Sequence, residues 1–276
     1  NMKNGFVRKL ASNDRRTRER TFKVLKQFLS SESNTKSLKK LELEKLWKGL
    51  FYTMWFSDRP LPQKRLATSM SQLFSQCISP EKFPAFVSAF WYIMSQEWSK
   101  VDKWRVDKYL LLMRYVVKEC FEMLKQSEYE EKLLYRYIDA LENGILSGDV
   151  KLAGVIVFHI VDVWLDEIEE VLFEELEDED EDIVKKVDEK EAEKHEEEVR
   201  QKKREIIANA PIDKLLEPMV KLYNSAPQKG LKKRILENVF EDDRLAEWGI
   251  DGSKYIMQKK RDEEISNDED EEWHGF

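Results

Sequence analysis

Hydrophobic residues recur along this 276-residue chain at the three- and four-residue spacing of amphipathic helices, and the alternation typical of strands is scarce. The densest run, from Leu43 to Phe56, is apolar on two sides of a helix and contains Gly49. A helix that is apolar on two sides is buried on two sides, and a glycine lets a neighbouring backbone approach closely. We therefore expect this helix at the centre of a helical domain, followed by a second helix that opens at Pro60 or Pro62.

The same periodicity predicts helices on both sides of this central pair. They are expected near residues 6–10, 15–29, 66–77, 83–94, 106–124, 133–141, 152–164, 211–223, 231–240 and 244–249. Helices joined by short polar links pack as antiparallel neighbours. The predicted fold is therefore all-α, with antiparallel helix pairs in a HEAT- or armadillo-like curved stack that carries a charged insert.

Charge divides the chain into regions. Residues 1–120 hold 24 Lys and Arg against 11 Asp and Glu, whereas residues 121–276 hold 23 against 44. From Asp166 to Asp182, 12 of 17 residues are acidic, and few apolar residues follow as far as Glu205. Such segments do not build a core. The predicted regions are a basic-to-neutral helical-repeat core at 1–165, an exposed or disordered charged insert at 166–205, C-terminal helices packing on the core at 206–250 and an acidic tail at 251–276.

Cationic residues crowd the start of the helix expected after Asp14, where the helix dipole disfavours positive charge. A solvated polar face would explain them, and so would contact with phosphates. Lysines and arginines after the central helix and before residue 110 form a second group. The candidate contacts to nucleic acid are Arg15, Arg16, Arg18, Arg20, Lys23, Lys64, Arg65, Lys103 and Lys108.

Asp102 is the expected cap of the helix whose apolar residues run from Val106 to Leu124, and aromatic residues alternate with lysines on one side of it. Trp104 and Tyr115 are the candidate partner-binding residues of this face. Such a face stacks bases while its lysines neutralise phosphates. Alternatively, a neighbouring helix buries the aromatic rings and the lysine stems reach out to solvent. The sequence leaves both interpretations open.

Patterns typical of catalysis or metal binding are missing from the sequence. It has no Walker phosphate loop and no glycine-rich dinucleotide motif, and His159, His195 and His274 lie far apart. Cys77 and Cys120 lack the C-x-x-C spacing. No apolar run approaches the roughly 20 residues that span a bilayer. We expect a soluble intracellular protein that is not an enzyme and has no cofactor, metal, membrane or small-molecule substrate.

The stretch WKGLFYTMWFSDRPLPQKRLA, from Trp47 to Ala67, resembles the signature of the ribosomal RNA-processing protein 1 family, also called the nucleolar protein 52 family. The resemblance continues through Asp102–Leu112, His159–Asp162 and Arg244–Gly249. It implies a non-catalytic assembly factor of pre-60S particles that is located in the nucleolus and needed for pre-rRNA processing. The implied partners are the pre-rRNA of the large subunit and other assembly factors, including Brix-domain and WD-repeat proteins.

Two other functions compete with this one. A protein–protein adaptor would use its basic half to bind an acidic protein, with no direct RNA contact. A nuclease acting on pre-rRNA has only the abundant carboxylates in its favour. Crosslinking to RNA in cells distinguishes the scaffold from the adaptor.

Overall fold

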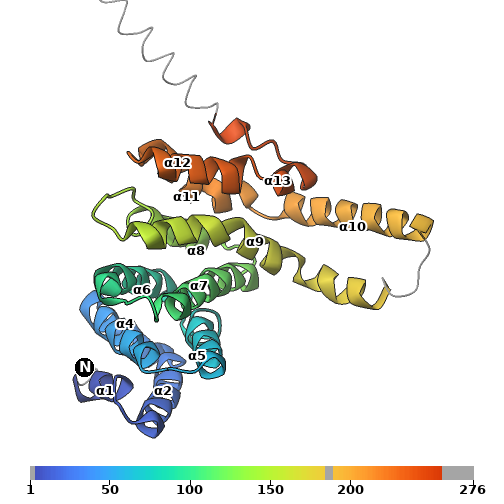
Figure 1. Cartoon of the computed structure of the whole chain (residues 1–276). Helices are drawn as coiled ribbons and strands as arrows, with labels where there is room; N and C mark the ends of the chain where they lie inside the picture. The colour runs from blue at the N-terminus through green and yellow to red at the C-terminus, as the bar shows by residue number, and fades with distance from the viewer. Residues whose placement is uncertain (1–3, 184–188, 257–276) are drawn as a thin grey trace, which may run out of the picture.

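The computed structural model describes residues 4–183 and 189–256, which form α-helices, short 3-10 and π-helical turns and loops, and no strand (Figure 1). The predicted all-α class is therefore confirmed. The α-helices are α1 Asn4–Leu10, α2 Arg15–Leu29, α3 Glu32–Lys36, α4 Lys40–Trp55, α5 Pro60–Gln72, α6 Phe83–Glu97, α7 Val106–Gln126, α8 Glu131–Glu142, α9 Gly154–Ile183, α10 Glu189–Asn209, α11 Ile212–Ser225, α12 Lys229–Ile235 and α13 Asp243–Glu247. The turns are η1 Leu73–Cys77, η2 Trp98–Lys100 and η3 Leu236–Phe240.

The helices form a stack of two layers (Figure 1). One layer contains α4, α6, α8 and α11 in succession, and the other contains α5 with η1, α7, α9 and α12 with η3. At the N-terminal end, α1 packs on α4 and α2 packs on η1. This arrangement confirms the predicted stack of antiparallel helix pairs.

The loops that lead from the first layer to the second lie along one edge of the stack, because every pair is antiparallel. We call this edge, formed by residues 11–14, 56–59, 98–105 and 143–153, the loop edge. Hydrogen bonds join its successive repeats. Thr53 Oγ1 donates to Leu10 O at 2.6 Å, Lys108 Nζ donates to Ser57 O at 2.9 Å, and Ala153 N donates to a serine hydroxyl at the end of α6 at 3.2 Å.

The core of the N-terminal half surrounds Trp47 of α4. The Trp47 ring is fully buried, and its centroid lies 5.4 Å from that of Phe74, 5.0 Å from that of Phe86 and 4.8 Å from that of Phe90. Aromatic rings at such separations bury large apolar areas and attract each other through their quadrupoles. The central position predicted for this helix is confirmed.

Gly49 lies where α1 crosses α4. A Cβ atom at this position would meet Val7 Cγ1 at 2.9 Å, closer than side-chain packing allows. The close approach expected from this glycine is confirmed.

The boundary predicted at residue 166 needs correction. α9 continues without a break from Gly154 to Ile183, and Ile168, Val171 and Phe173 are buried against the rest of the stack. Residues 166–173 therefore belong to the core. The many acidic residues led to the prediction of an exposed segment, although the apolar residues within it still recur at helical spacing.

The C-terminal part packs on the core beyond residue 250 as well. The Tyr255 ring lies 5.6 Å from that of Phe240, and Gly252 is buried. Residues 257–276, the greater part of the predicted acidic tail, lie outside the described residues. Within the two described ranges, no helix combines the length and hydropathy needed to cross a membrane.

Candidate nucleic-acid interface

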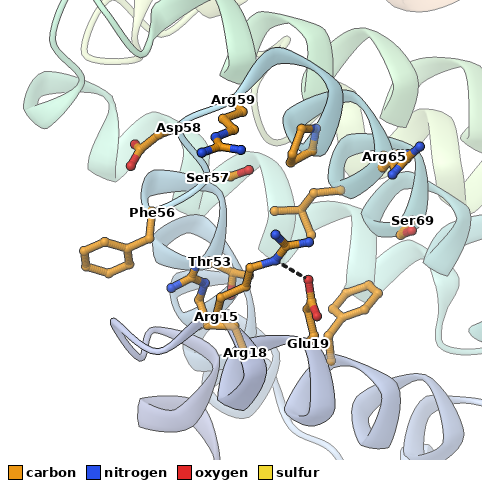
Figure 2. A pocket seen from close by; sticks show the side chains of 13 residues that line it. Arg15, Arg18, Glu19, Thr53, Phe56, Ser57, Asp58, Arg59, Arg65 and Ser69 are labelled. Atoms are coloured by element: carbon orange, nitrogen blue, oxygen red, sulfur yellow. Dashed lines mark hydrogen bonds and ion pairs between the residues drawn. The ribbon is translucent and has the colours of Figure 1, made fainter.

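A groove of about 500 Å³ opens between α2 and the start of α5 (Figure 2). Arg15 and Arg18 line it from α2, and Arg59 and Arg65 line it from the opposite wall. Its carboxylates are Glu19 and Asp58, and its apolar lining comes from Phe22, Pro62 and Leu66. With four arginines against two carboxylates, the groove has a net positive charge and attracts anions.

The position of the first two arginines follows from the cap of α2. The Asp14 side chain accepts hydrogen bonds from Thr17 N at 2.8 Å and from Thr17 Oγ1 at 2.6 Å. These hydrogen bonds lower the pKa of Asp14 below its usual value. The cap fixes where α2 begins, and therefore the direction in which its first turn presents its side chains.

Arg15 and Arg18 make different contacts. Arg15 Nε donates to Glu19 Oε1 at 2.7 Å, one turn further along α2, and both side chains are exposed. Arg18 Nη1 donates to the carbonyl oxygens of Ser12 at 2.8 Å and Asn13 at 3.0 Å, so it holds the loop before α2. The Arg18 guanidinium also lies 5.8 Å from the centroid of the Phe56 ring.

Arg59 and Arg65 present the least neutralised charge in the groove. Both side chains are exposed, and neither has an ion-pair partner among residues 4–183 and 189–256. Arg59 is the residue just before α5, and Pro60 occupies the first turn of that helix. A guanidinium that is not paired offers five N–H donors to phosphate or carboxylate oxygens.

The groove unites only part of the predicted set. It brings Arg15, Arg18 and Arg65 together and adds Arg59, which the sequence analysis missed. The signal for Arg59 was its place directly before the proline that marks a helix start. The other candidates on these helices are exposed but do not line the groove; they are Arg16, Arg20, Lys23 and Lys64.

Lys108 is not a phosphate contact, and this prediction was wrong. The residue is buried, and its Nζ atom donates to Trp55 O at 2.8 Å and to Ser57 O at 2.9 Å. Burial lowers the pKa of Lys108 to about 8. A lysine on a helix is usually exposed, but the carbonyl oxygens at the end of α4 accept hydrogen bonds from the Lys108 ammonium and hold it inside.

Trp104 lies in the loop before α7 and is 81% exposed. Its backbone N–H donates to Asp102 Oδ1 at 2.9 Å, and Lys103 Nζ lies 4.8 Å from the centroid of its ring. Lys103 is also exposed. The loop edge therefore carries a cation and a large aromatic ring side by side, and it also carries Arg59 of the arginine groove.

Tyr115 occupies a different surface. It is half-buried and lines a hollow of about 390 Å³ between α5, α7 and α9, together with Lys118 and Glu170. Trp104 precedes α7, so it does not share a helical face with Tyr115. The structure therefore separates the two candidate partner-binding residues.

The histidine in the middle of the chain is part of the packing. The ring Nε2 of His159 lies 2.8 Å from Leu110 O, and burial lowers the pKa of this histidine. In the part of the chain that the structure describes, no group of three or more His, Cys, Asp or Glu residues is placed to hold a metal ion.

Comparison with known proteins identifies the family of the chain. The family model described as "Nucleolar protein, Nop52" matches residues 1–275. The ribosomal RNA processing protein 1 homolog B of Mus musculus is 39% identical over 165 residues, which are 59% of this chain and 23% of that protein. The homolog B of Homo sapiens is 36% identical over 173 residues, or 62% of this chain and 23% of that protein.

A more distant relative gives the same picture. The ribosomal RNA processing protein 1 homolog of Caenorhabditis elegans is 31% identical over 164 residues, which are 59% of this chain and 41% of that protein. The matches thus span less than half the length of these three relatives.

Proposed function

Because the chain belongs to the Nop52 family of nucleolar proteins, we propose that it is a non-catalytic assembly factor of nucleolar pre-60S particles. In this role it is needed for pre-rRNA processing and acts as a scaffold that contacts rRNA and other assembly factors. Its relatives are named as ribosomal RNA processing proteins, which supports the role in processing. Brix-domain and WD-repeat proteins are the expected neighbours.

The residues of the family signature support the scaffold role, because they make contacts within the helical stack. Trp47 fills the core, Arg105 and Asp102 pair with each other, and Lys108 binds carbonyl oxygens at the end of α4. Each of these contacts stabilises the stack, and none positions a reacting group. A rigid stack with long exposed faces is suited to holding several partners at once.

The observation that carries the RNA contact is the arginine groove. Arg59 and Arg65 are exposed and have no ion-pair partner in the described ranges, while pre-rRNA presents a dense array of phosphates. Arginine binds phosphate oxygens through two parallel N–H donors. Such contacts fix the position of the protein on RNA and do not depend on base sequence.

Sedimentation of cell extracts tests this proposal. The protein should cosediment with precursors of the large subunit, and its depletion should stall processing toward the large-subunit rRNAs. A fluorescent fusion should accumulate in the nucleolus. Cosedimentation only with small-subunit precursors would defeat the proposal.

A protein–protein adaptor without RNA contact is the second candidate. The exposed ring of Trp104 beside Lys103 favours it, because tryptophan is enriched among the residues that dominate protein interfaces. Tyr115 would serve a second partner on its own surface. Ultraviolet crosslinking in cells separates the two functions, since an adaptor yields no covalent adduct with rRNA.

A further inference from the structure

Trp104 is the most conspicuous unexplained side chain on the loop edge. With 81% of its surface exposed, it leaves a large flat ring in water, an arrangement that contributes nothing to the core. Single exposed apolar residues are common on protein surfaces. This one differs because its ring lies beside Lys103 and on the same loop edge as Arg59, which lines a groove with a net positive charge.

The loop that carries Trp104 is held in place from both sides. The guanidinium of Arg105 lies 4.2 Å from the ring centroid of Trp55 and pairs with Asp102. Asp102 in turn accepts the backbone N–H of Trp104. Trp104 thus lies in an ordered loop, so little conformational entropy is lost when a ligand stacks on its ring.

The Trp104 loop and the arginine groove are neighbouring parts of one surface. Lys108, near the start of α7, donates to the carbonyl oxygen of Ser57, and Ser57 lines the groove. Arg59 follows two residues later along the same loop. A ligand that extends along the loop edge therefore meets the groove arginines and the Trp104 ring in succession.

The chemistry of this surface selects its ligand. The groove holds four arginines against two carboxylates, and the Trp104 loop adds Lys103 without an opposing carboxylate contact in the described chain. A cationic track beside an exposed aromatic ring is typical of proteins that bind single-stranded nucleic acid, where successive bases stack on such rings. In a duplex the base faces are stacked on one another and out of reach of a surface indole.

We propose that the loop edge binds an unpaired, single-stranded segment of RNA, with phosphates at the arginine groove and one base stacked on Trp104. This inference rests on the proposed function and adds the form of the RNA that is recognised. It assigns Trp104 to RNA and leaves Tyr115, which lies on another surface, outside the site.

Binding of the purified 276-residue chain to two RNA probes tests the inference. One probe is a labelled single strand of about 12 nucleotides and the other is the same sequence in a duplex. The single strand should bind at least about tenfold more tightly than the duplex. Trp104→Ala should weaken single-strand binding about tenfold, the loss expected for one base stack, whereas Trp104→Phe should retain most of the affinity.

Tyr135 provides a matched control. It is an aromatic residue on α8 that is 65% exposed and does not belong to the loop edge. Tyr135→Ala should leave binding of both probes unchanged. Equal binding of the two probes, or wild-type affinity of Trp104→Ala for the single strand, would overturn the inference.

The outcome also separates this inference from the function on which it rests. If the chain cosediments with large-subunit precursors but binds neither probe, the inference is wrong and the scaffold role stands through protein contacts. If polyglutamate binds with the affinity of the single strand and with the same dependence on Trp104, the loop edge is a site for an acidic protein and the inference is again wrong. Failure of cosedimentation would instead defeat the proposed function.

Discussion

The arginines at the two ends of the helical stack have different surroundings. In the C-terminal half, Arg244 Nη1 contacts Asp166 Oδ1 at 2.8 Å, and Arg244 Nη2 contacts Asp242 Oδ2 at 2.9 Å. In the N-terminal half, Arg59 and Arg65 have no ion-pair partner among the described residues. Arg244 holds elements of the C-terminal half together, whereas Arg59 and Arg65 of the groove remain free to bind a ligand.

The acidic helix α9 explains the difference. Asp166 is shared by Arg244 and by Arg114, whose Nη2 atom lies 3.3 Å from Asp166 Oδ2, and the buried Glu167 accepts a hydrogen bond from Arg114 at 2.5 Å. α9 thus neutralises Arg114 of α7 and Arg244 of α13. No acidic helix packs on the groove in the described part of the chain. A net charge summed over half of the sequence does not reveal this distribution.

The largest effect on stability is expected from Arg244→Ala. It leaves Asp242 without its charged donor and leaves Asp166 with Arg114 alone, so the free energy of unfolding should fall by about 1.5–3 kcal/mol, as for a lost hydrogen bond to a charged group. Affinity for single-stranded RNA should stay unchanged. Urea denaturation and RNA titration measure the two quantities.

Arg200→Ala is the control for this prediction. Arg200 forms only an exposed ion pair with Glu197, at 2.7 Å within α10, and such pairs contribute little to stability. If Arg244→Ala weakened RNA binding and left unfolding unchanged, the comparison of the two halves would be reversed.

The second prediction concerns Arg59 and Arg65, replaced together by alanine. Because both side chains are exposed and unpaired in the described chain, the free energy of unfolding should change by no more than about 0.5 kcal/mol. The slope of log affinity against log salt should become shallower by about 1.4, since each single-strand phosphate contact contributes about 0.7.

Arg16 and Lys23 serve as the matched pair for this experiment. They are exposed on α2 but do not line the groove, so their joint replacement by alanine should flatten the salt slope less. Equal slopes for the two double variants would show that general surface charge, and not the groove, governs binding.

The smallest effect on RNA binding is expected from Lys108→Met. Lys108 is buried against the end of α4, so the variant should bind RNA with the wild-type salt slope. A shallower salt slope for this variant would show that Lys108 contacts a phosphate and would contradict its buried position.

The difference in stability between wild type and Lys108→Met should depend on pH in a defined direction. The pKa of Lys108 is lowered by burial from 10.5 to about 8, so between these values the unfolded chain holds more protons than the folded chain. The contribution of Lys108 to the free energy of unfolding therefore rises as the pH increases through this range. Wild type should gain stability relative to Lys108→Met between pH 8 and pH 10.5. If wild type instead lost stability relative to Lys108→Met over this interval, the pKa of Lys108 would not be lowered in the folded chain.

The helices were predictable from the sequence because the apolar residues repeat at helical spacing and short polar links separate the runs. Trp47 and Gly49 occupy the central positions expected of them. Single-residue assignments at helix starts were less secure. Lys108 is the example, because its burial depends on two carbonyl oxygens at the end of α4 that accept its ammonium group.

The groove itself was only partly predictable. Arg15 and Arg65 are 50 positions apart in the sequence, and only the packing of α2 against η1 brings their helices together. Trp55 shows the same limit: helical spacing places it in the apolar run from Leu43 to Phe56, yet it is half-buried with Arg105 on its ring. Contacts between repeats depend on the curvature and register of the stack, which periodicity does not report.

Ultraviolet crosslinking of the protein to RNA inside purified pre-60S particles, followed by identification of the modified peptides, tests the central claim most directly. We expect adducts on peptides that contain Arg59, Arg65 and Trp104, and few on α10. Adducts confined to α9 and α10, or particles that contain the protein without any adduct on the loop edge or the arginine groove, would contradict the account.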